Sequence, residues 1–123
     1  MSEEYRHTQT QVCEFFRKHY GLSDVEALII LDDILLNLDA MVADWESGAE
    51  RQCPPEWQRG RIAAAVLALG QNMQCDGLVD IGTGLAAAIE AADPPDPDAI
   101  APLRTFVKAM RRAMPDTHRS VAD

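Results

Sequence analysis

The sequence predicts an all-α fold, a compact bundle of about five helices that form a single domain. Alanine is abundant, leucine outnumbers either valine or isoleucine, and no stretch alternates apolar with polar residues as a half-buried strand does. Hydrophobic residues make up 47% of the 123 residues and charged residues 25%, which is typical of a globular chain with one core. We therefore expect a helical bundle domain over residues 1–115 and a flexible tail over residues 116–123.

Capping residues and helix breakers predict where the first three helices begin and end. The first helix covers about residues 3–20, and Gly21 follows it as a C-terminal cap. The second covers about residues 24–46 and starts with a capping box, in which Ser23 and Glu26 each accept a hydrogen bond from the other's backbone N–H. Pro54 and Pro55 indicate the start of a third helix over about residues 55–74.

Two further helices are predicted in the remaining chain. The fourth covers about residues 78–92, where Asp80 is a candidate cap, and its two glycines each cost roughly 1 kcal/mol relative to alanine. Residues 93–97 form a stiff proline-rich connector. Asp96 or Asp98 can then cap a fifth helix that ends near Met114, before Pro115.

Charge and cysteine content limit the classes of partner and compartment. Acidic residues number 20 and basic residues 11, so the net charge of -9 repels phosphate backbones and anionic membranes, and we expect neither nucleic-acid nor membrane binding. Cys13, Cys53 and Cys75 are widely spaced and have no histidine at zinc-site spacing, which favours reduced thiols and no metal. The polar, acidic start of the chain and the absence of a long apolar run favour a cytoplasmic location.

A glycine-containing string in the fourth helix is the sharpest local motif. Residues 78–84, LVDIGTG, resemble the glycine-rich first motif of S-adenosylmethionine-dependent methyltransferases, and the resemblance implies that Asp80, Gly82 and Gly84 bind a ligand. In that family the motif follows the first strand of a doubly wound sheet, which needs well over a hundred further residues. Only about 39 residues follow here, without a strand pattern. We therefore expect a helix in which Gly82 and Gly84 allow close helix contact, and no cofactor.

The second helix has apolar residues on more than one side. A seam of residues recurs at steps of three and four, and it comprises Leu28, Leu31, Leu35, Leu38, Val42 and Trp45. Such a helix is either central in its bundle, with a solvated acidic edge, or shared with a partner chain. We predict a protein partner or a homodimer, and the interface candidates are Ile30, Ile34, Met41, Asp32, Asp39, Trp45 and Glu46.

Acidic and basic rows predict how the second and fifth helices pack. Asp32, Asp39 and Glu46 flank the apolar seam, and Arg104 and Arg111 hold equivalent positions beside the seam of the fifth helix. In an up-and-down bundle these two helices run antiparallel, so the rows can face each other. The basic helix could instead dock on an anionic membrane, but the acidic row in the same chain favours internal pairing.

The sequence shows no complete catalytic constellation, so we predict that the protein is not an enzyme. Glu4 and His7 have the spacing of a di-iron bundle ligand pair, but a second such pair is missing. The predicted function is a non-catalytic, acidic protein-binding module: an adaptor, a regulatory subunit or an inhibitor. A narrower alternative is an immunity-type or antitoxin-type inhibitor of a basic enzyme. An alternative of a different class is a ligand-binding or enzymatic helical domain that uses Asp80, Gly82 and Gly84.

Overall fold

The computed structural model describes residues 2–47, 55–92 and 95–114, and this part of the chain is all-α and contains no strand. The elements are α1 (Ser2–Tyr20), α2 (Asp24–Ser47), α3 (Pro55–Asn72), α4 (Asp76–Ala91), the short 3-10 helix η2 (Pro97–Ile100) and α5 (Ala101–Ala113). The predicted fold class is therefore confirmed. The predicted tail over residues 116–123, Cys53 and residues 93–94 of the connector lie outside the described residues.

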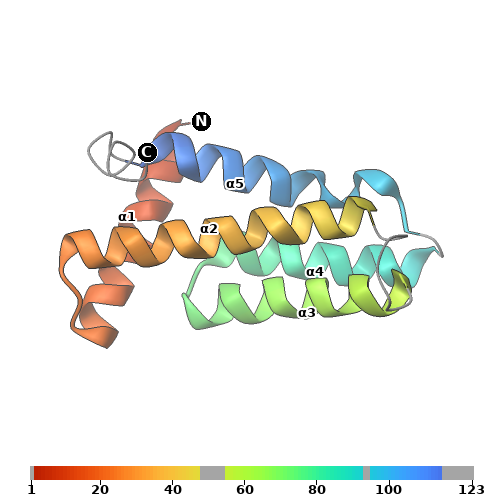
Figure 1. Ribbon diagram of the computed structural model, residues 1–123, viewed down its shortest axis with the longest axis horizontal. Coiled ribbons are helices and arrows are strands. Elements are labelled where there is room, and N and C mark those ends of the chain that lie inside the picture. The colour runs from red at the N-terminus through yellow and green to blue at the C-terminus, as the bar shows by residue number, and fades with distance from the viewer. Residues whose placement is uncertain (1, 48–54, 93–94, 115–123) are drawn as a thin grey trace.

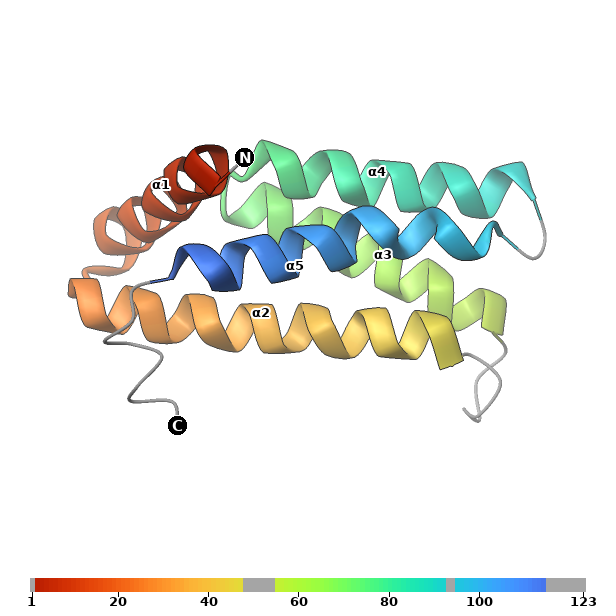
Figure 2. The same cartoon turned by 90° about the horizontal axis from the view of Figure 1, so that it is seen from above.

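Four helices lie lengthwise along the molecule, and α1 crosses them obliquely at one end (Figure 1). α2 and α4 run in one direction, whereas α3 and α5 run in the opposite direction. α2 contacts α1, α3 and α5. Figure 2 shows that α2 lies along one edge of the molecule and has no described helix beyond it. One side of α2 therefore faces solvent over its length.

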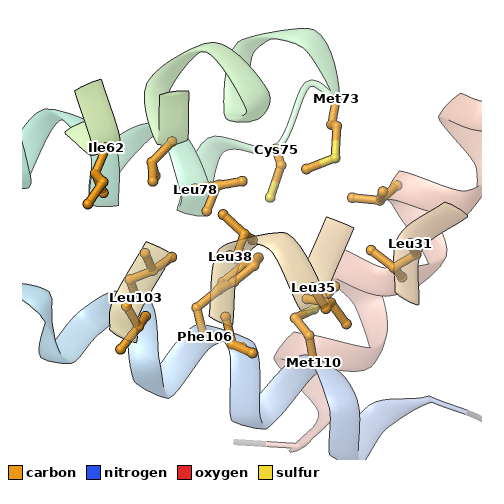
Figure 3. Close-up of a cluster of buried hydrophobic side chains, with 14 of the residues drawn as sticks. Leu31, Leu35, Leu38, Ile62, Met73, Cys75, Leu78, Leu103, Phe106 and Met110 are labelled. Atoms are coloured by element: carbon orange, nitrogen blue, oxygen red, sulfur yellow. The ribbon is translucent and has the colours of Figure 1, made fainter. Parts of the chain in front are cut away.

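The core is formed where the apolar seams of the lengthwise helices meet (Figure 3). α2 contributes Leu31, Leu35 and Leu38, α5 contributes Leu103 and Met110, and all five side chains are buried. Of the seam predicted for the second helix, only Leu28 is half-buried. The predicted seam is therefore the one that holds α2 in the bundle.

α3 and α4 pack closely because a glycine on each helix lies against the backbone of the other. A Cβ atom added at Gly82 would lie 2.7 Å from the backbone nitrogen of Leu67, and one at Gly70 would lie 2.6 Å from that of Val79. The predicted close contact at Gly82 is confirmed. Gly84, in contrast, is exposed, and an added Cβ atom would meet no atom within 4 Å.

The start of α4 differs from the prediction. α4 begins at Asp76 and not at Leu78, and Asp80 lies inside the helix, so the prediction of Asp80 as a cap was wrong. The N-cap residue is Cys75, whose carbonyl accepts hydrogen bonds from the N–H groups of Leu78 and Val79 at 3.1 and 3.0 Å. Gln74 adopts a positive φ of 55° before it, and this tight turn allows the helix to resume early.

The predicted caps at the junction of α1 and α2 are present, whereas the predicted aspartate cap of α5 is not. Ser23 N–H donates to Glu26 Oε1 at 2.9 Å, and Glu26 N–H donates to Ser23 Oγ at 3.1 Å, which completes the capping box. Gly21, with φ of 66°, donates its N–H to the Arg17 carbonyl at 3.0 Å and ends α1. Asp96 accepts a hydrogen bond from Asp98 N–H at 2.9 Å, so it caps η2 and not α5 itself. These caps fix the start of α2 and hence the direction in which each of its side chains points.

Candidate functional site

The solvent-facing side of α2 carries a row of exposed aliphatic side chains. Val25 is 64% exposed, Ile29 46% and Leu36 52%. They are four and seven residues apart, a spacing that places them on one line along the helix. We call these three residues the outer stripe. The opposite side of α2 is already buried in the core, so the outer stripe has no role in holding α2 in the bundle.

An acidic row on the α5 side of α2 is paired within the molecule. Asp32 Oδ1 accepts a hydrogen bond from Arg111 Nη1 at 3.2 Å, and Glu46 forms an ion pair with Arg104. The predicted antiparallel packing of the acidic and basic rows is therefore confirmed. These pairs are partly exposed and contribute about 0–1 kcal/mol each, so they select α5 as a neighbour more than they stabilise the fold.

Asp39 lies in the same row, between Asp32 and Glu46, but it takes part in neither ion pair. It is exposed, and in the part of the chain that the structure describes no Lys or Arg nitrogen forms an ion pair with it. Arg104 and Arg111 are directed to Glu46 and Asp32 at the two ends of the row. Of the predicted acidic row, Asp39 is therefore the residue that has neither arginine as an ion-pair partner.

A second acidic row lies on the other side of the outer stripe. It comprises Glu26 and Asp33, which are seven residues apart and therefore lie on one line; we call them the outer acidic row. Among the described residues, no Lys or Arg forms an ion pair with either carboxylate. Glu26 accepts the Ser23 backbone and hydroxyl hydrogen bonds, which lower the pKa of its carboxyl group, so it stays ionised at neutral pH.

The apolar interface candidates predicted from the sequence lie elsewhere on α2. Ile30 is 38% exposed, whereas Ile34 and Met41 are half-buried and pack against the core. Trp45 is only 2% exposed, and the Arg59 guanidinium lies 5.8 Å from the centre of its ring. Trp45 is therefore a core residue whose ring is closed to a partner in this conformation.

The sequence prediction missed the outer stripe, although a signal for it was present. Val25, Ile29 and Leu36 are spaced by four and seven residues and fall on the side opposite the a/d seam. Assignment of every apolar residue of the helix to a face would have separated them from Ile30, Ile34 and Met41. Glu26 and Asp33, the two residues of the outer acidic row, lie beside the outer stripe on the same helix.

Asp80, Gly82 and Gly84 do not converge on a common site. Gly82 packs against Leu67 of α3, where the backbone leaves no space for a ligand, and Asp80 and Gly84 lie one turn apart on the exposed side of α4. α4 runs continuously through all three residues, so the strand and turn that the methyltransferase motif requires are not formed here.

A polar groove of about 440 Å³ lies between α1 and the turn from α3 to α4. Its lining residues include Lys18, His19, Gln74, Cys75 and Asp76. Burial raises the pKa of the Cys75 thiol, so the thiolate that nucleophilic chemistry needs is disfavoured. Within the described residues, no group of three or more His, Cys, Asp or Glu side chains is placed to hold a metal ion.

Comparisons with known proteins identify no match. No protein-family model matches the chain, and neither the curated proteins nor the solved structures include a significant match to it. None of the described helices combines the length and apolar character needed to cross a bilayer.

Proposed function

We propose that the protein is a non-catalytic helical module that binds another protein through the outer stripe of α2. The observation that carries this proposal is the alignment of three exposed aliphatic side chains on a helix whose inner side is already buried. Single exposed aliphatic residues are normal on a protein surface, but three in one line next to ionised side chains are typical of a docking surface. The role of adaptor, regulatory subunit or inhibitor would use the same surface.

The distribution of charge supports a partner that differs from this chain. α2 contains seven acidic residues and no Lys or Arg: Asp24, Glu26, Asp32, Asp33, Asp39, Asp44 and Glu46. If two copies packed their outer stripes together, carboxylates would face carboxylates along the contact, which is unfavourable. A basic partner would gain from the same field, and the net charge of -9 would accelerate its approach.

This electrostatic preference supports the narrower alternative of an inhibitor that covers a basic enzyme surface. Inhibitors of this kind use an acidic surface to speed association with a cationic site. The outer stripe would add the apolar contact that slows dissociation. Both features lie on one side of one helix, so a single contact could use them together.

Site-specific photo-crosslinking in the native cell tests the proposed function. A benzoylphenylalanine residue replaces Leu36 in one variant and Ala86, which is exposed on α4, in a matched control. We expect a discrete crosslinked protein product from position 36 and none of that size from position 86. Absence of a product from position 36, or the same product from both positions, would contradict docking on α2.

A further inference from the structure

We propose that the segment bound on the outer stripe is a cationic amphipathic helix, with its apolar residues against Val25, Ile29 and Leu36 and its Lys or Arg residues beside Glu26 and Asp33. This inference rests on the proposed function and adds the chemistry of the partner. The proposed occupant is a helix of the partner, and not a second copy of this chain, an extended peptide or an anionic surface.

The shape of the stripe favours a helical partner. The distance along the axis from Val25 to Leu36 is about 16 Å, or three turns, so a helix of three to four turns would cover it. Exposed side chains in one line along a helix can pack between the side-chain ridges of a second helix. An extended peptide that binds by adding a strand to a sheet has no strand to pair with among the described residues.

The two flanks of the stripe differ in charge, and this difference sets where the partner's cations lie. On the α5 side, Arg111 and Arg104 pair with Asp32 and Glu46, and of that row only Asp39 has no ion pair among the described residues. On the other side, the outer acidic row has no basic partner in the described part of the chain. Two unpaired carboxylates lie on this side against one on the α5 side, where Arg104 and Arg111 would also repel a cation. The cations of a bound helix would therefore gain most beside Glu26 and Asp33, which favours one rotation of that helix about its axis.

The same charges argue against the other occupants. A second copy would place its own Asp33 near the outer acidic row, and its α2 has no Lys or Arg with which to compensate. Nucleic acid and an anionic membrane would both bring negative charge to a row of carboxylates. A cationic helix is the occupant that complements both the aliphatic line and the unpaired acidic row.

Binding of three designed peptides to the purified protein, measured by fluorescence anisotropy, tests this inference. The first peptide is an amphipathic helix with leucine on one face and lysine on its flanks, the second has glutamate in place of lysine, and the third is a scrambled lysine peptide of the same composition. We expect micromolar binding of the first peptide only, and binding that weakens as salt increases. Equal binding of the scrambled peptide would show non-specific charge attraction and overturn the inference, as would equal binding of the glutamate peptide or no binding.

Variants of α2 locate the bound peptide. Leu36→Asp should weaken binding at least tenfold, and Leu36→Ala, which adds no charge, should weaken it several-fold. Asp33→Asn should weaken binding several-fold and reduce its salt dependence, whereas the matched variant Asp80→Asn on α4 should leave it unchanged. If Asp33→Asn and Asp80→Asn have equal effects, the cations do not lie beside the outer acidic row.

Two outcomes separate this inference from the proposed function. A crosslinked partner at position 36 together with no binding of the lysine peptide would leave the docking surface in place and show that the partner's chemistry is wrong. Sedimentation that shows a dimer, lost in Leu36→Asp, would identify a second copy as the occupant and overturn the inference. Failure of both the crosslinking and the peptide binding would remove both proposals.

Discussion

Two pairs of neighbouring residues in α2 have the same chemistry but opposite surroundings. Leu35 is fully buried in the core, whereas Leu36 is 52% exposed. Asp32 pairs with Arg111 of α5, whereas Asp33 is exposed and has no ion pair among the described residues. Adjacent residues in a helix point about 100° apart, which is enough to move a side chain from the core or a helix contact to solvent.

The comparison shows that α2 has two sides of different use. The inner side, with Leu35 and Asp32, holds the helix in the bundle and selects α5 as its neighbour. The outer side, with Leu36 and Asp33, repeats the same apolar and acidic chemistry without a neighbour in the described part of the chain. The proposed function assigns that outer side to a partner.

The largest expected difference is between the losses of unfolding free energy caused by alanine at Leu35 and at Leu36. Leu35→Ala should lower the free energy of unfolding by about 2–5 kcal/mol, because it leaves a cavity in the core. Leu36→Ala should change it by no more than about 0.5 kcal/mol, because its side chain is half in solvent and alanine favours the helix. Urea denaturation of both variants measures this, and equal losses would show that Leu36 is also part of the core.

The glycines of α4 offer the same comparison between an inner and an outer side. Gly82→Ala should destabilise the protein by about 1–3 kcal/mol, because the new Cβ atom would lie 2.7 Å from the backbone nitrogen of Leu67. Gly84→Ala should stabilise it by about 0.5–1 kcal/mol, because the site is open and alanine favours the helix. Thermal unfolding of the two variants measures this; a shift in the same direction would contradict the different roles of the glycines.

A double-mutant cycle should distinguish the two aspartates. The coupling free energy between Asp32 and Arg111 should be favourable, up to about 1 kcal/mol at low salt, and smaller at high salt. The coupling between Asp33 and Arg111 should be close to zero, because Asp33 points away from α5. Urea denaturation at two salt concentrations gives both values, and equal coupling would show that the paired and unpaired rows are not distinct.

The smallest expected effect is a pH dependence at Glu26. The hydrogen bonds from Ser23 lower the pKa of the Glu26 carboxyl group in the folded state, so its contribution to stability is present above the unfolded pKa and is lost as the pH falls through the folded pKa. Glu26→Gln should therefore remove this part of the loss of stability on acidification, whereas Ser23→Ala would keep the backbone N–H that is the larger cause. Thermal unfolding between about pH 6 and pH 3 checks this, and an unchanged slope in Glu26→Gln would contradict it.

The buried side of α2 could be predicted from the sequence because its residues follow the spacing of a helix that packs along one face. Steps of three and four residues marked the buried seam from Leu31 to Trp45, and the charged rows predicted α5 as the antiparallel neighbour. The outer stripe was not predicted, because residues outside that seam were grouped together as surplus apolar surface. Their separation into half-buried Ile34 and Met41 and exposed Val25 and Leu36 depends on where α1, α3 and α5 pack.

The turn between α3 and α4 could not be predicted from local preferences. Gln74 adopts a positive φ, which glycine and asparagine favour, so the residue type at this position does not indicate a turn. The close approach at Gly82 was predicted, but its counterpart Gly70 on α3 was not. Identification of Gly70 requires the register of the two helices, and that register is set by the turn.

Amide chemical-shift mapping with the lysine peptide tests the central claim most directly, because it shows where on the whole surface the peptide binds. Uniformly labelled protein is titrated with the peptide, and each backbone amide is followed. We predict saturable shifts centred on Val25, Ile29, Asp33 and Leu36, with little change at Asp80 and Gly84 on α4. Shifts centred on α4, or spread evenly over all acidic surfaces, would contradict the assignment of the outer side of α2 to a partner.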